Sequence, residues 1–268
     1  MAPFATDGSQ DFASRIEPSP EQKRTIIFIA VYAVAITILW NVPYLKQVLW
    51  PFKIVTVALH EFGHASAALC TGGKIVSITL DPDEGGLTKM RGGNPYITLP
   101  AGYIGSAFWG ALMVFAGFDV LASKVVSVMI GLAMLATLYW ARNWLTRGIT
   151  LLFIGLIALL WWIDGGYYLR YFVLFMGDFQ ELKLLLHSIR VMSCLYSLWD
   201  IIEDLVTRKV NESDASRFSH LCCGGCVPAQ VWGFLWFLIS LAFLGVAVVA
   251  ALLVFKEENA TPTTPTGQ

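Results

Sequence analysis

The chain has 268 residues, of which 56% are hydrophobic and 14% charged, and its formal net charge is −1. Soluble globular domains carry about 25% charged residues, so this composition argues against an ordinary water-soluble protein. The near-neutral charge leaves no basic excess for binding nucleic acid, and we expect no nucleic acid among the partners. The main surroundings of the chain are therefore expected to be a lipid bilayer.

The two ends of the chain are polar. Residues 1–24 carry several charges, and Pro18 and Pro20 disfavour a helix there, so we expect a solvated, mobile terminus. It does not resemble a signal peptide, because the apolar run begins late and no small-residue cleavage site follows it. Residues 256–268 are polar and expected to be disordered. Residues 25–255 are predicted to form one membrane domain.

Apolar stretches near the length of about 20 residues that crosses a bilayer recur along the middle of the chain. Tyr167–Met176 is too short to cross alone, and Leu182–Val206 is long enough but amphipathic. These stretches predict an all-α, multi-pass membrane protein with about six transmembrane helices. The clear candidates are Thr25–Val42, Phe52–Cys70, Tyr96–Phe118, Val120–Trp140, the shorter Ile149–Ile163, and Val231–Phe255.

A small β-hairpin is predicted directly after Phe52–Cys70. Gly72 and Gly73 end the helix, side chains then alternate in polarity, and residues 81–86 form a turn between two short strands over residues 74–88. Two interpretations remain open. The hairpin is either a plain connector or an exposed strand edge that binds an extended segment of another protein by β-augmentation.

The distribution of Lys and Arg predicts the orientation, because cytosolic loops carry the excess of cations. A cytosolic N-terminus places only Lys46, Lys53 and Lys124 on the other side of the membrane. The cations then placed in the cytosol are Arg15, Lys23, Arg24, Lys74, Lys89, Arg91, Arg142 and Arg147.

The motif that indicates chemistry is His60–Glu61–Phe62–Gly63–His64, inside the second apolar stretch. On a helix, residues four apart lie on the same face one turn apart, so both imidazoles can bind one Zn²⁺. Glu61 is then placed to act as a general base toward water. Three ionisable groups in an apolar span are costly unless they have a function, which favours a metal site over an unused polar cluster.

A catalytic zinc site needs a third protein ligand. The amphipathic stretch Leu182–Val206 has a polar stripe that includes His187, Asp200 and Asp204. This stripe either faces a polar site within the bundle or is a solvated helix surface. Asp164, after the short fifth stretch, is a separate candidate.

Together these features resemble the site-2-protease type of intramembrane zinc metallopeptidase, and more narrowly its small peptidase-like branch found in bacteria, fungi and plants. The resemblance covers roughly residues 50 to 245 and implies that the membrane domain of residues 25–255 is metallopeptidase-like. The matching stretches are residues 58–65, Thr71–Gly72–Gly73, residues 81–88, Pro100–Ala101–Gly102–Tyr103–Ile104–Gly105, residues 196–204, Ser213–Asp214–Ala215 and residues 231–236.

The resemblance implies a zinc protease that cuts membrane segments of other proteins, with His60 and His64 as ligands and Glu61 as base. Its third ligand is usually an Asp in a Leu-Asp-Gly context, and this chain departs from that pattern. We predict Asp200 as the third ligand, followed in order by Asp204, Asp214 and Asp164. The alternative function is a non-proteolytic membrane scaffold or transporter that retains the metal site.

Overall fold

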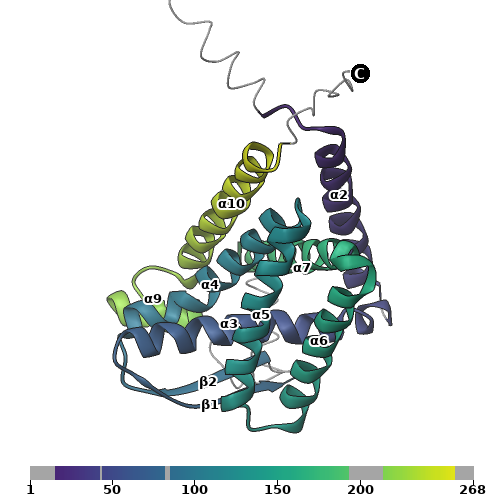
Figure 1. The fold of residues 1–268 in the computed structure, drawn as a ribbon. Coiled ribbons are helices and arrows are strands. Elements are labelled where there is room, and N and C mark those ends of the chain that lie inside the picture. Colours follow the sequence, from purple (N-terminus) through teal and green to yellow (C-terminus); the bar gives the residue numbers. More distant parts are fainter. Residues whose placement is uncertain (1–15, 43, 82–84, 193–213, 257–268) are drawn as a thin grey trace, which may run out of the picture.

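The computed structural model describes residues 16–42, 44–81, 85–192 and 214–256 (Figure 1). Within these ranges the predicted class is confirmed, since the structure is mostly helical and has one small two-stranded sheet. The elements are α2 Pro20–Asn41, α3 Trp50–Cys70, β1 Lys74–Asp81, β2 Gly85–Arg91, α4 Pro95–Ala116, α5 Val120–Trp140, α6 Trp144–Trp162, α7 Tyr167–Met192, α9 Asp214–Cys223 and α10 Ala229–Val254, with short 3-10 turns η1 Leu45–Gln47 and η2 Ile163–Gly166.

Five helical segments of the described chain are long and apolar enough to cross a membrane, compared with about six expected. They are Pro20–Leu39, Pro95–Ala116, Val120–Trp140, Trp144–Phe179 and Ala229–Val254. Helix α3 has the expected length but is not among them, because ionisable residues interrupt its apolar sequence. In Figure 1, α3 runs across the view at a steep angle to α5 and α10.

Two helix boundaries differ from the sequence expectation. Helix α2 begins at Pro20 rather than Thr25, because a proline at the first helical position loses no backbone hydrogen bond. Ser19 and Gln22 form a capping box that stabilises this start. Helix α7 runs unbroken from Tyr167 to Met192, where two separate segments were expected, and residues 193–206 lie outside the described part of the chain.

The predicted hairpin is present. Strands β1 and β2 pair antiparallel from Lys74 opposite Arg91 to Asp81 opposite Gly85. The outer edge of β1 is covered, because Ala141 bridges to Ile78 and the Asn143 side-chain amide donates to the Leu80 carbonyl over 2.6 Å. Strand β2 therefore forms the other edge of this two-stranded sheet.

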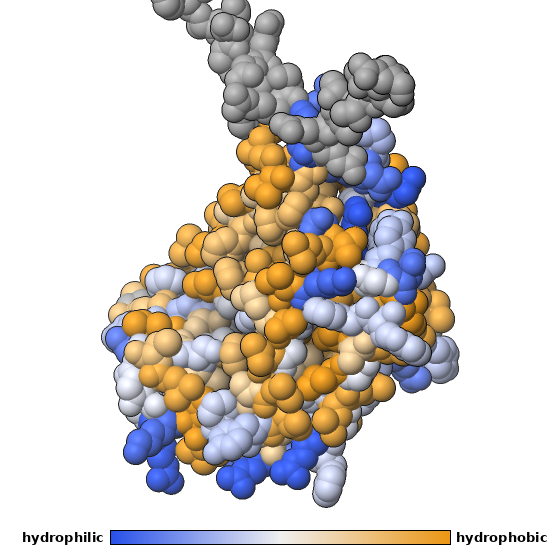
Figure 2. Space-filling model, in the orientation of Figure 1, coloured by the Kyte–Doolittle hydropathy of each residue, from blue (hydrophilic) through white to orange (hydrophobic). Residues whose placement is uncertain are grey.

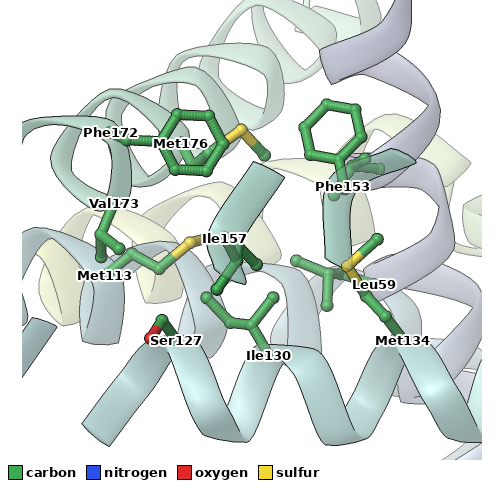
Figure 3. A pocket seen from close by; sticks show the side chains of 11 residues that line it. Leu59, Met113, Ser127, Ile130, Met134, Phe153, Ile157, Phe172, Val173 and Met176 are labelled. Atoms are coloured by element: carbon green, nitrogen blue, oxygen red, sulfur yellow. The ribbon is translucent and has the colours of Figure 1, made fainter. Parts of the chain in front are cut away.

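An apolar core joins α3 to the helices that follow it. Figure 3 shows a small pocket in this core, lined by side chains from α3, α4, α5, α6 and α7. Leu59 contributes from α3, next in sequence to His60, and is 2% exposed. The apolar core therefore holds α3, the helix that carries the His-Glu-x-x-His motif, in position.

Helices α3 and α4 touch backbone to backbone. A Cβ added at Gly105 would lie 3.2 Å from the Gly63 Cα, and one added at Gly63 would lie 3.2 Å from the Ala101 carbonyl carbon. Only residues without side chains permit this distance. The contact brings the α4 backbone against the face of α3 that carries His60 and His64.

Hydrogen bonds identify which helix ends meet. The Gln22 side chain donates to the carbonyls of Ala251 and Leu252, so the start of α2 lies at the end of α10. Arg170 donates to the Gly117 carbonyl over 2.8 Å and to the Thr25 hydroxyl over 2.6 Å, which adds the end of α4 to this group.

The hairpin lies at the other end of the bundle. It directly precedes α4, whose 22 residues span about 33 Å. The cations near the N-terminus and those of the hairpin therefore lie at opposite ends of the bundle. The expected orientation had both groups on the cytosolic side of the membrane. The count of cations no longer decides the orientation, and the cytosolic N-terminus stays a prediction.

Replacement of Gly63 by Ala is expected to destabilise the protein, because the new methyl group would collide with the Ala101 carbonyl. Overpacking of this kind costs about 1–3 kcal/mol, so the unfolding temperature in detergent should fall. Gly131→Ala in α5 is the control, since a Cβ there meets nothing within 4 Å. An equal effect of both substitutions would contradict the close contact between α3 and α4.

Candidate metal centre

Helix α3 presents the two histidines of the motif on one face. Their Nε2 atoms lie 3.1 Å apart, and the ring planes are nearly perpendicular. His64 is 6% exposed and Glu61 is 4% exposed, so the motif is largely shielded from solvent. The structure thus brings His60 and His64 together as the i, i+4 spacing predicts.

Asp214 completes the group. Its Oδ2 lies 3.1 Å from Nε2 of His60 and 3.1 Å from Nε2 of His64. The three ligand atoms lie within 4.8 Å of one another, so these residues could hold one metal ion. Two imidazoles and one carboxylate are a donor set found in catalytic zinc sites, which keep a fourth position open.

Aromatic contacts fix the helix that supplies Asp214. Asp214 is the first residue of α9, and Phe218, one turn later, packs edge-on against Trp232 with ring centroids 4.8 Å apart. Trp236 lies 5.8 Å from Phe218 and stacks on Tyr103 of α4 at 5.0 Å. Because both tryptophans belong to α10, α9 is anchored to α10 and through it to α4.

Helix α4 supports the two imidazoles. The Thr98 carbonyl accepts a hydrogen bond of 2.6 Å from Nδ1 of His64, which leaves Nε2 as the metal-binding nitrogen. A Cβ at Gly102 would lie 2.5 Å from Nε2 of His60 and closer still to His64. The edge of the His60 ring meets the Tyr103 ring at 5.0 Å.

Strand β2 holds the side chain of Glu61. The Thr88 hydroxyl donates to Glu61 Oε2 over 2.6 Å and lies 3.2 Å from the Glu61 backbone carbonyl. A Cβ at Gly86 would lie 2.5 Å from Glu61 Cγ, so only glycine lets the strand approach this closely. Thr88 and Thr98 were not among the site residues expected from the sequence, although Thr88 lies in the matching stretch of residues 81–88.

Four candidates for the third ligand came from the sequence. Asp200, the first choice, and Asp204 lie outside the described residues. Asp164 lies in η2, between α6 and α7, and is not part of the group. Asp214, ranked third, is the carboxylate that the described residues bring to the two histidines.

The charge state of Asp214 fits this role. Burial alone would raise the pKa of its carboxyl group. The hydrogen bonds and charge interactions with His60 and His64 outweigh burial and hold this pKa below its ordinary value. Asp214 is therefore a carboxylate at neutral pH, the form that binds a metal ion.

Comparison with known proteins gives a match to a protein family. The family model described as Peptidase M50B-like matches residues 29–247. The chain belongs to this family. It is the site-2-protease-like family that the motifs resembled, and the match begins about 20 residues before the stretch expected from them. No curated protein and no solved structure gives a significant match.

Membership of the M50B-like family has two consequences for this chain. Peptidases of the M50 family are zinc-dependent, in agreement with the donor set of His60, His64 and Asp214. Together with the five apolar helices, membership indicates an integral membrane protein and suggests an intramembrane metallopeptidase.

Replacement of Asp214 by Ala is expected to lower zinc affinity about 100-fold or more, because it removes one of three ligands. Elemental analysis and chelator competition on the purified protein measure this. Asp164→Ala should keep its zinc, because Asp164 is not part of the group. Loss of zinc in Asp200→Ala with full zinc in Asp214→Ala would contradict the geometry and assign the third ligand to Asp200.

Proposed function

We propose that this protein is an intramembrane zinc metalloendopeptidase that hydrolyses peptide bonds in membrane-spanning segments of other proteins. The observation that supports this most directly is the group of His60, His64 and Asp214, with Glu61 on the same helix as the histidines, in a chain of the M50B-like family. Three protein ligands that leave a fourth position open beside a carboxylate base are the arrangement that peptide hydrolysis needs.

In this mechanism His60, His64 and Asp214 hold the ion. When bound, zinc supplies Lewis acidity, which polarises the scissile carbonyl and makes water a better nucleophile. Glu61 takes the proton from the attacking water and delivers it to the leaving amine. Thr88 donates a hydrogen bond to Oε2 of Glu61, which orients this carboxylate. The Thr98 carbonyl keeps the His64 ring in one tautomer.

The substrate must reach this site in an extended form. Backbone amides of a transmembrane helix are hydrogen-bonded within the helix, so the segment has to unwind before its carbonyl is accessible. We assign its binding to the edge of β2, because residues 141–143 cover the edge of β1 and Thr88 of β2 contacts Glu61. Pairing by β-augmentation would replace the lost helical hydrogen bonds beside the catalytic base.

Replacement of Glu61 by Gln tests the reaction. It removes the base and no ligand, so cleavage should fall at least about 100-fold while zinc stays bound. Proteomic comparison of membrane-protein fragments in cells producing either form measures cleavage, and elemental analysis measures zinc. Glu21→Gln is the control, because Glu21 pairs with Arg24 at the other end of the bundle. Identical fragments with wild type and Glu61→Gln would favour the non-proteolytic alternative.

Replacement of Thr88 by Val removes the hydroxyl that holds Glu61 and keeps the shape of the side chain. A hydrogen bond to a charged group contributes about 1.5–3 kcal/mol, so turnover should fall about 10-fold or more with zinc unchanged. Thr88→Ser should retain most activity, because it keeps the donor. Thr79→Val makes the same change on β1, where the hydroxyl contacts the Leu87 carbonyl instead. Equal losses of turnover in Thr88→Val and Thr79→Val would show that the substitutions act through the stability of the hairpin and not through Glu61.

A further inference from the structure

Exposed cations gather on one face of the hairpin. The strand register places Lys74 directly opposite Arg91, and Lys89 lies two residues before Arg91 on the same face of β2. All three side chains are exposed. Like charges directly opposite each other destabilise a strand pair, so this arrangement favours a negatively charged ligand.

The described part of the chain supplies no acidic partner for these cations. The ion pairs of Arg24 with Glu21 and of the two histidines with Asp214 do not involve these cations. Asp81, the last residue of β1, lies seven residues along the strand from Lys74, which corresponds to about 23 Å. These exposed cations have no ion pair within the described residues, so an anionic ligand can bind them.

Two further exposed cations flank β1 where α5 ends and α6 begins. The Arg142 backbone N–H donates to the Ile78 carbonyl, which fixes this connection beside the hairpin. The Arg147 guanidinium donates to the Ala141 carbonyl over 3.2 Å. We call the five residues Lys74, Lys89, Arg91, Arg142 and Arg147 the hairpin cation surface.

Exposed aromatic side chains border the connection between α5 and α6. Tyr139 is 82% exposed and Trp144 is 84% exposed, and the Arg147 guanidinium lies 5.5 Å from the Trp144 ring centroid. Tyrosine and tryptophan concentrate at the depth of the lipid headgroups. Figure 2 shows hydrophobic residues over the middle of the molecule and hydrophilic residues at the end formed by β1 and β2.

We propose that the hairpin cation surface binds the headgroups of anionic phospholipids. The aromatic residues and the adjoining spans α5 and α6 place the cations at headgroup depth, where lipid phosphates supply the missing negative charge. These two features favour lipid over an acidic segment of a protein substrate. The proposal depends on the membrane location of the protein and not on its catalysis.

The test measures lipid binding by the purified full-length protein. Native mass spectrometry counts bound phosphatidylglycerol and phosphatidylcholine as each lipid is added to the protein in detergent. The triple variant Lys74→Gln, Lys89→Gln, Arg91→Gln should lose phosphatidylglycerol binding about tenfold or more and keep phosphatidylcholine binding.

A matched control removes the same number of cations at the opposite end of the bundle. Its substitutions are Lys23→Gln and Arg24→Gln near the start of α2 and Lys256→Gln after the end of α10. The control variant should bind phosphatidylglycerol as wild type does, because it leaves the hairpin cation surface unchanged. Thermal unfolding of each variant in phosphatidylcholine confirms that it is folded.

Three outcomes would overturn the proposal. The first is equal phosphatidylglycerol binding by wild type and the hairpin triple variant. The second is displacement of phosphatidylglycerol by an equal concentration of soluble glycerol phosphate, which would indicate a simple anion site. The third is a triple variant that keeps lipid binding but loses binding of an acidic peptide, which would assign the surface to a protein.

Discussion

The contact between α3 and α4 determines the rest of the site. Because Gly63 and Gly105 allow the two backbones to touch, Gly102 lies against both imidazoles and the Thr98 carbonyl reaches His64. A helix pair at ordinary separation would leave room for side chains between the backbone of α4 and the two histidines. The candidate metal centre therefore depends on the close approach of the two backbones. The Thr98 carbonyl hydrogen-bonds to His64, and Gly102 has no side chain that would displace the imidazole rings.

Features determined by short stretches of sequence were predictable. The His-Glu-x-x-His spacing predicted that His60 and His64 share a face, and alternating polarity between glycines predicted the hairpin. Each of these depends on residues within one element, where helical or strand periodicity is decisive. The apolar stretches likewise predicted four of the five candidate spans closely, apart from the position of their ends.

Features determined by tertiary packing were predicted less well, since Asp214 was a candidate ligand but ranked behind Asp200 and Asp204. Helical periodicity identified a polar stripe containing Asp200 but carried no information on what that stripe faces. Asp214 reaches the histidines from 150 and 154 residues away, because Phe218 packs against two tryptophans of α10. Thr88 likewise contacts Glu61 only because the hairpin folds back on α3. No local sequence pattern indicates that α3 crosses the other helices at a steep angle.

The distance along the chain between the histidines and Asp214 affects the order in which the site is assembled. His60 and His64 leave the ribosome long before α9 and α10, the two elements that supply and anchor the carboxylate. During synthesis the inserted helices therefore carry a base and two imidazoles without the complete donor set. Under the proposed function, hydrolysis would require α9 and α10 to be in place, so a chain that ends before them would be inactive.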